Sequence, residues 1–72
     1  MKTTFELIEQ YLLSVVDLPE VELLDYSVNG SIIKIQYSYK SPYINTRLYD
    51  NYIEVELLNY ITFLYNFKNI NN

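Results

Sequence analysis

Cysteine and histidine are both absent from this 72-residue sequence, and glycine occurs once. Without cysteine, neither disulfides nor thiolate metal ligands are available. Without histidine, the chain lacks the commonest general base and the commonest metal-binding side chain. A single glycine also excludes a glycine-rich phosphate-binding loop. We therefore predict a protein that is not an enzyme and that has no catalytic residues, no metal site and no cofactor.

Long apolar runs are lacking too. Acidic or polar side chains interrupt each apolar stretch, so no segment reaches the roughly 20 apolar residues that span a bilayer, and no membrane association is expected. Glu6 comes too early for a secretory signal. Half of the residues are apolar, which is enough for the core of one small domain over residues 1–72. We expect a cytoplasmic protein with a frayed tail at 69–72.

Residue choice carries a hint of origin. The chain has no alanine and one arginine, whereas tyrosine, asparagine and isoleucine, whose codons are rich in A and T, are frequent. This bias suggests a bacterial host with an AT-rich genome, or one of its phages or plasmids.

Two segments have the apolar periodicity of helices. The first spans residues 4–16, where Thr3 and Glu6 have the spacing of a capping box and Pro19 disfavours helix beyond it. The second spans about 57–68. Its apolar arc covers more than half of the helix circumference, which is wider than a surface helix needs. We expect this second helix to be covered on two sides.

Between the helices, Asn29-Gly30 is a preferred pair for a two-residue type I′ turn, which needs a positive φ at both positions. It predicts a β-hairpin with arms at 20–28 and 31–40. In this register Asp25 lies opposite Lys34 on the outer face. The pairs on the core face are then Tyr26 with Ile33, Leu24 with Ile35 and Glu22 with Tyr37, and Val28 lies opposite Ser31.

The stretch after the hairpin has two interpretations. Alternation of side chains favours a third strand over about 47–53, whereas Asn51 and Glu54 have the spacing of a helix start. We favour the strand. The sequence then predicts a small α+β domain: an N-terminal helix, a central antiparallel hairpin extended by the third strand, and a C-terminal helix. Both helices would pack on one sheet face.

Charge is unevenly distributed along the chain, whose net charge is -4. The acidic side chains are concentrated before the turn, while residues 31–49 contain three cations and no acid. Glu6, Glu9 and Asp17, facing outward from the first helix, would suit a basic partner surface or stand in for nucleic-acid phosphates. The negative net charge and low isoelectric point argue against direct binding of long nucleic acid, which depends on phosphate neutralisation.

Nine tyrosines are the other notable feature, since tyrosine is enriched at protein interfaces. The predicted register leaves Tyr39, Tyr43 and Tyr49 free to contact a partner. Lys40 and Arg47 lie among them, so an anion or nucleotide is an alternative ligand of segment 37–49.

The leading functional hypothesis is a small acidic protein that binds and inhibits a macromolecular partner, with a protein as the expected partner. A phage or mobile-element inhibitor, such as a counter-defence or anti-CRISPR-type protein, fits this description, as does an immunity protein or antitoxin. The alternative is a module that binds or sequesters a small ligand or nucleotide. Small size and surplus apolar surface also predict a homodimer. Its expected interface residues are Leu7, Tyr11, Phe63 and Phe67.

Overall fold

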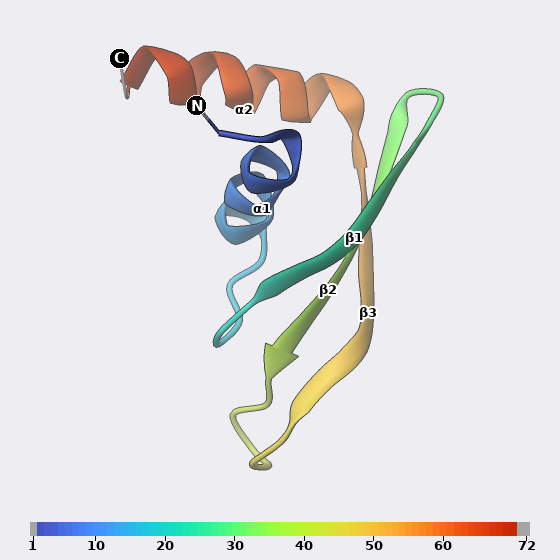
Figure 1. The fold of residues 1–72 in the computed structure, drawn as a ribbon, viewed down its shortest axis with the longest axis vertical. Coiled ribbons are helices and arrows are strands. Elements are labelled where there is room, and N and C mark those ends of the chain that lie inside the picture. The colour runs from blue at the N-terminus through green and yellow to red at the C-terminus, as the bar shows by residue number, and fades with distance from the viewer. Residues whose placement is uncertain (1, 71–72) are drawn as a thin grey trace.

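The computed structural model describes the backbone of residues 2–70 and the side chains of residues 2–67. In chain order its elements are α1 (Thr4–Val15), β1 (Glu22–Asn29), β2 (Ile32–Lys40), β3 (Arg47–Glu56) and α2 (Leu57–Ile70). The strands form one antiparallel sheet in the order β1-β2-β3 (Figure 1). The predicted α+β architecture is confirmed.

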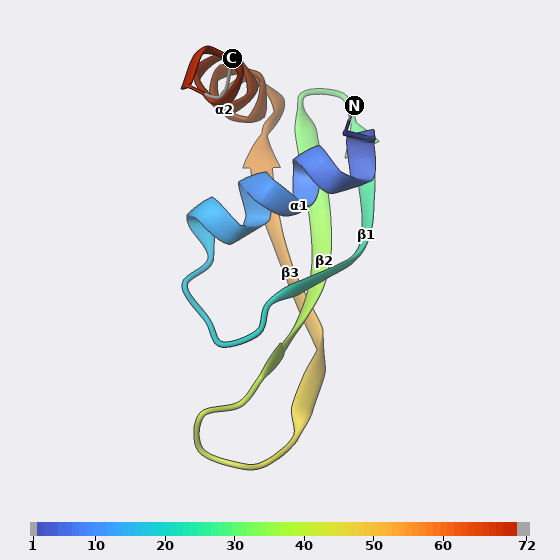
Figure 2. The ribbon, with the colours of Figure 1, turned by 60° about the vertical axis from the view of Figure 1, so that its left-hand side comes forward.

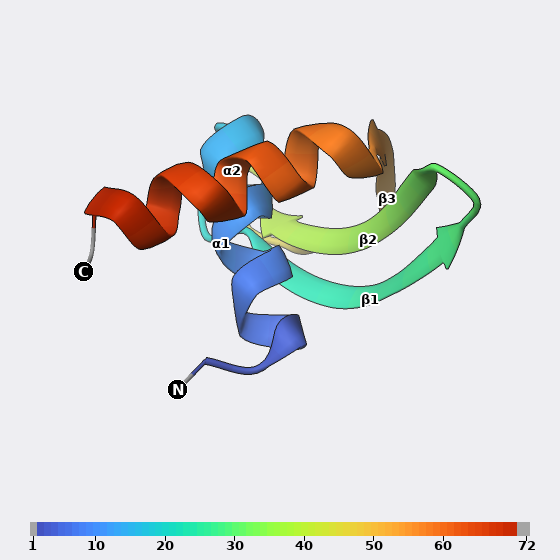
Figure 3. The ribbon, with the colours of Figure 1, turned by 90° about the horizontal axis from the view of Figure 1, so that it is seen from above.

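Both helices lie on the same side of the curved sheet. Helix α1 runs across the strands in Figure 2, and α2 follows β3 without a loop and crosses one end of the sheet. Seen from above in Figure 3, the two helices cross and the opposite sheet face carries no helix. Neither helix in the described chain has the length and hydropathy of a membrane-spanning segment.

Helix α1 begins as its sequence predicts. The Thr3 hydroxyl accepts a hydrogen bond from the Glu6 amide at 3.2 Å, and Glu6 Oε1 accepts one from the Thr3 amide at 3.2 Å. This capping box satisfies two amides that the helix cannot pair internally, and the Thr3 hydrogen bonds lower the pKa of Glu6. The helix ends at Val15, one residue before the predicted end.

The hairpin between β1 and β2 forms, but its predicted turn is wrong by one residue. Asn29 pairs with Ile32, so Gly30 and Ser31 form the turn. Gly30 has a φ of 65° and Asn29 does not have a positive φ. A positive φ at the first turn position alone is typical of type II′ rather than type I′. The Leu57 amide donates to the Ser31 carbonyl at 2.7 Å, so the turn also holds the start of α2.

The prediction that Leu24 lies on the core face is wrong, because the register of β1 shifts at this residue. The shift interrupts the β1–β2 pairing between Leu23 and Asp25, which indicates a β-bulge. Leu23 consequently faces the core, with 5% of its surface exposed, while Leu24 is 42% exposed. The expected Asp25–Lys34 pair is also wrong, because Asp25 lies opposite Gln36.

The third strand is confirmed and is longer than predicted, because β3 continues to Glu56 before α2 begins. The alternative helix start at Asn51 is wrong. Asn69 and Ile70 belong to α2, so of the predicted frayed tail only Asn71 and Asn72 lie outside the described residues.

The core lies between α1, α2 and the inner sheet face. Tyr11 links the two helices, because its ring centroid lies 5.6 Å from that of Tyr60 and 5.2 Å from that of Phe63. Tyr37 is buried as predicted, and Tyr26 is partly buried against the same cluster. The buried apolar residues are Ile8, Tyr11, Leu12, Val21, Leu23, Ile33, Ile35, Tyr37 and Tyr60.

Candidate functional site

The loop between β2 and β3 forms a projecting tip at the end of the sheet far from α2 (Figure 1). Its residues 41–46 are held by their own hydrogen bonds. The Ser41 hydroxyl accepts from the amides of Tyr43 at 3.2 Å and Ile44 at 3.3 Å. The Ser41 amide donates to the Thr46 carbonyl at 3.0 Å, which closes the loop. The loop is thus ordered locally, without help from the core.

The ordered loop presents two large apolar side chains to solvent. Tyr43 is 93% exposed, the highest value among the exposed large hydrophobic residues, and Ile44 is 56% exposed. Burying these apolar side chains against a partner would be favourable. The hydrogen bonds within the loop would reduce the conformational entropy that it loses on binding. We call Tyr43 and Ile44 the hairpin tip; Tyr49, which is 62% exposed, follows in β3.

Arg47 fixes the base of the hairpin tip. Its Nη1 donates to the Ser38 hydroxyl at 2.8 Å, and its Nη2 donates to the Glu20 carbonyl at 2.8 Å. The carboxylates of Glu20 and Glu22 each lie 3.9 Å from Nη2. The guanidinium therefore joins β2 and β3 to the connection between α1 and β1.

A backbone hydrogen bond reinforces this junction. The Lys40 amide, in the last residue of β2, donates to the Pro19 carbonyl at 3.0 Å. The neighbouring Glu20 has a φ of 51°, which L-residues other than glycine rarely adopt. The turn at Pro19-Glu20 thus aims two successive carbonyls at the β2–β3 hairpin, one toward Lys40 and one toward Arg47.

The three tyrosines predicted to contact a partner fall into two groups. Tyr43 is exposed on the hairpin tip, and Tyr49 is exposed in the following strand β3. Tyr39 is partly buried against the core, and its ring centroid lies 6.4 Å from that of Tyr37. Ile44 was missed by the sequence reasoning. An isoleucine between Pro42 and Asn45, in a segment already read as a loop, was the signal that would have found it.

The three acids predicted on the outer face of the first helix have different surroundings. Glu6 belongs to the capping box, and Glu9 Oε2 accepts a hydrogen bond from the Leu23 amide at 3.5 Å, on the sheet side of the helix. Asp17 lies beyond the end of α1, in the connection to β1. Glu20 and Glu22, which the sequence reasoning did not select, are the exposed acids at the base of the tip.

Lys40 and Arg47, the residues proposed for anion binding, lie in different environments. Lys40 is exposed, whereas the Arg47 guanidinium already contacts Ser38 and the Glu20 carbonyl. An anion at Arg47 would have to compete with two carboxylates that lie 3.9 Å away. The geometry therefore favours a structural role for Arg47.

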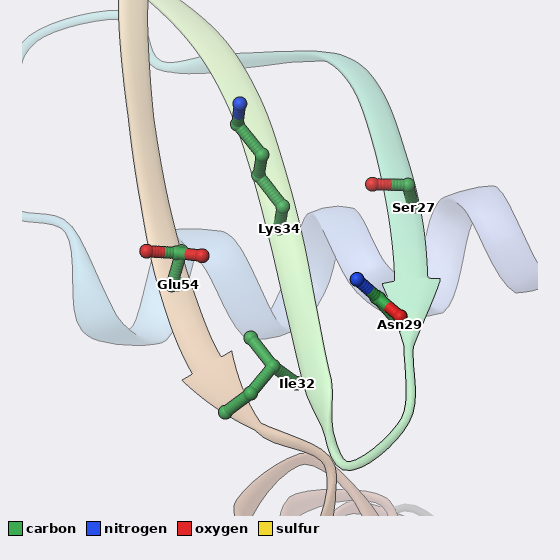
Figure 4. Close-up of a pocket in the computed structure, with 5 residues that line it drawn as sticks. All are labelled: Ser27, Asn29, Ile32, Lys34 and Glu54. Atoms are coloured by element: carbon green, nitrogen blue, oxygen red, sulfur yellow. The ribbon is translucent and has the colours of Figure 1, made fainter.

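A shallow hollow of about 230 Å³ lies elsewhere, on the helix-free sheet face (Figure 4). The Lys34 side chain extends along the sheet, and its Nζ lies 4.6 Å from the centroid of the Tyr52 ring. Among the described residues, no group of three or more acidic side chains is placed to hold a metal ion. The hollow is lined by Ser27, Asn29, Ile32, Lys34 and Glu54.

The residues predicted for a dimer interface lie where α1 meets α2 in one chain. Tyr11 is buried there and contacts Phe63, and Leu7 is partly buried. Phe67 stacks on Phe63 with ring centroids 5.6 Å apart, and Lys2 Nζ lies 5.6 Å from the Phe67 centroid. Much of this apolar surface is therefore covered within the monomer.

Comparison with known proteins gives no relative from which a function can be transferred. The chain matches no family model, and no curated protein or solved structure is significantly similar to it.

Proposed function

We propose that this chain binds a protein partner through its hairpin tip and inhibits that partner. The observation that carries the proposal is the almost complete exposure of Tyr43 on a loop held by the Ser41 hydroxyl. Tyrosines of this kind supply large contact area with few rotatable bonds to freeze, and they are frequent among the residues that dominate binding energy.

Charge around the tip indicates the chemistry of the partner. Glu20 and Glu22 are both largely exposed at the base of the tip, and the cations there are Arg47 and Lys40, which pair across β2 and β3. Asp50, which is exposed next to Tyr49, is a third carboxylate, so the acids at this end of the molecule exceed the cations by one. A basic partner surface would be steered toward this end of the molecule. We therefore expect a protein with a cationic site, such as one that binds nucleic-acid phosphates.

Binding at such a site would inhibit by occupying it. The exposed aromatic tip would enter the site while the carboxylates at its base replace phosphate groups. This mechanism needs no catalytic residue, and it suits an inhibitor encoded by a phage or mobile element, including the counter-defence and anti-CRISPR-type classes. It suits an immunity protein or antitoxin equally. We place the interaction in the cytoplasm of a bacterial host, and we treat self-association as a separate property of the chain.

Photo-crosslinking tests the proposal. A benzophenone amino acid at Tyr43 should capture the partner from a host lysate, whereas the same group at Tyr52 should not. Tyr52 is a matched control because it is 59% exposed but lies on the open sheet face. With the partner purified, Tyr43→Ala should weaken binding about 30-fold, the effect of a hot-spot residue worth roughly 2 kcal/mol.

Inhibition itself needs a second measurement. The purified chain should block nucleic-acid binding by the captured partner, and the block should weaken as salt is added because exposed charges are screened. Unchanged binding by Tyr43→Ala would show that the tip is not the interface. Tight binding without loss of partner activity would instead retain the interface and remove the inhibitory role.

A further inference from the structure

The turn between β1 and β2 places the one asparagine-glycine pair of the sequence, Asn29-Gly30, at the surface. A Cβ added to Gly30 would meet nothing within 4 Å, so the turn is open on that side. The Asn29 side chain lies at the rim of the hollow on the helix-free sheet face (Figure 4). In the described part of the chain, no group is hydrogen-bonded to the Asn29 side-chain amide, and no carbonyl accepts from the Gly30 amide. The two groups are therefore exposed, adjacent and unpaired.

An unpaired asparagine side chain reacts with the backbone nitrogen that follows it. The Gly30 nitrogen, after losing its proton, would form a bond to Asn29 Cγ, and the Cγ–Nδ2 bond would break. The leaving Nδ2 takes up a proton and departs as ammonia, which leaves a five-membered cyclic imide. One water molecule then opens this ring. Opening at Cγ gives aspartate, and opening at the Asn29 main-chain carbonyl gives isoaspartate. Glycine favours the attack, because it has no Cβ to crowd the nitrogen and its backbone is the most adaptable.

We propose that Asn29 is a site of spontaneous deamidation in the folded chain and that isoaspartate at this position weakens the β1–β2 hairpin. Exposure alone does not single out Asn29, because Asn45 is exposed too. The difference lies in the nitrogen that follows. The Thr46 amide is engaged, since it donates to the Ile44 carbonyl at 2.8 Å, and the β-branched side chain of Thr46 crowds it.

The other asparagines whose side chains the structure describes are held more firmly. The Asn51 side chain donates to two main-chain carbonyls, at 3.4 and 3.0 Å. Asn59 and Asn66 lie within α2, where the hydrogen bonds of the helix fix the backbone. Each of these three residues is followed by an aromatic residue rather than by glycine. Asn29 is therefore the reactive position among them.

Isoaspartate would disturb the turn through its backbone. Its main chain runs through Cβ and Cγ, which adds one atom to the strand at the residue that pairs with Ile32. The neighbouring Ser31 carbonyl accepts from the Leu57 amide at 2.7 Å, so the start of α2 would lose support as the turn moves. Either product also adds one negative charge to the net charge of -4, in a hollow that Glu54 already lines. This turn and the hairpin tip lie at opposite ends of the sheet (Figure 1), so the proposal is independent of partner binding.

Peptide mapping by mass spectrometry tests the reaction. Trypsin cleaves after Lys34, Lys40 and Arg47, so Asn29 and Asn45 fall in different peptides, each with a single asparagine. In the folded chain kept at neutral pH, Asn29 should lose its amide at least tenfold faster than Asn45. Methylation by an isoaspartyl methyltransferase should then detect isoaspartate in the peptide that contains position 29. The rate should rise with pH, because the attacking nitrogen must first lose its proton. Equal rates at the two asparagines, or a reaction at Asn29 confined to the urea-unfolded chain, would overturn the proposal.

A matched variant tests the effect on the hairpin. Asn29→Gln keeps a side-chain amide, but its extra methylene would require a six-membered ring, which closes far more slowly. Each chain is compared with its own fresh sample by urea unfolding. The urea midpoint of the parent chain should fall as isoaspartate accumulates, whereas that of Asn29→Gln should stay constant. A constant midpoint in a parent chain that contains isoaspartate, or an equal fall in both chains, would overturn the assigned effect.

Discussion

Replacing Arg47 by methionine should destabilise the chain more than most single substitutions would. Methionine keeps much of the aliphatic stem of the arginine and removes its guanidinium. Most of the lost stability comes from Ser38. This residue has 0% exposure, and its hydroxyl accepts the hydrogen bond from Arg47 Nη1 at 2.8 Å. A buried hydroxyl without its partner costs about 1–3 kcal/mol.

The remaining contacts of Arg47 contribute less. The hydrogen bond to the Glu20 carbonyl is exposed, so water replaces it in part. The carboxylates of Glu20 and Glu22 are largely exposed and 3.9 Å away, and each such ion pair contributes about 0–1 kcal/mol. We therefore expect Arg47→Met to lower the free energy of unfolding by about 2–4 kcal/mol. The whole free energy of unfolding of a 72-residue chain is roughly 4–11 kcal/mol.

Urea unfolding followed by circular dichroism measures this effect, and a double-mutant cycle assigns its source. In Arg47→Met/Ser38→Ala the orphaned hydroxyl is gone, so the double variant should be more stable than the sum of the single effects by about 1–2 kcal/mol. Arg47→Lys should be intermediate, because an ammonium cannot reach two acceptors as the planar guanidinium does. A change below about 0.5 kcal/mol for Arg47→Met, with additive single effects, would refute the structural role.

Two further predictions concern the bulge and the α1–α2 contact. Leu23→Ala should lower the free energy of unfolding by about 2–4 kcal/mol and Leu24→Ala by less than about 1 kcal/mol, since only Leu23 is buried; a reversed order in urea unfolding would place Leu24 in the core. Burial, with Tyr26 nearby, raises the pKa of Tyr60. The stabilisation that Tyr60 contributes is therefore complete below the pKa of tyrosine in the unfolded chain, about 10. It is lost as the pH rises through the higher pKa of the folded state. Tyr60→Phe should flatten the alkaline fall of the urea midpoint, and an unchanged fall would exclude Tyr60 as its cause.

The helices and strands were predictable because each is encoded locally. The Thr3–Glu6 capping box lies within one turn of helix, and the apolar periodicities of α1 and α2 need no knowledge of the rest of the chain. The third strand was predicted for the same reason, from its alternation. Its extension to Glu56 was not, because where β3 ends depends on its pairing with Ile32 of β2.

The turn error has a specific physical origin. Moving a two-residue turn by one position shifts each cross-strand partner by two, and a shift of two keeps every side chain on its original face. Tyr26 thus remains on the core face whether it pairs with Ile33, as predicted, or with Ile35, as observed. Alternation of side chains cannot distinguish these registers. The sequence pattern also does not reveal the bulge at Leu24, because Leu23 and Leu24 are the same residue type and either could face the core.

The candidate site, like the fold, was predictable only in part. Exposure of Tyr43 and Tyr49 was predictable, since both lie in or beside a segment with loop residues. The role of Arg47 was not, because its partners Glu20 and Ser38 are far from it in sequence and the carbonyl of Glu20 can be supplied by any residue type. The three cations of segment 31–49 therefore have different environments: Arg47 is bound to the acidic connection, Lys34 lies over Tyr52, and Lys40 is exposed.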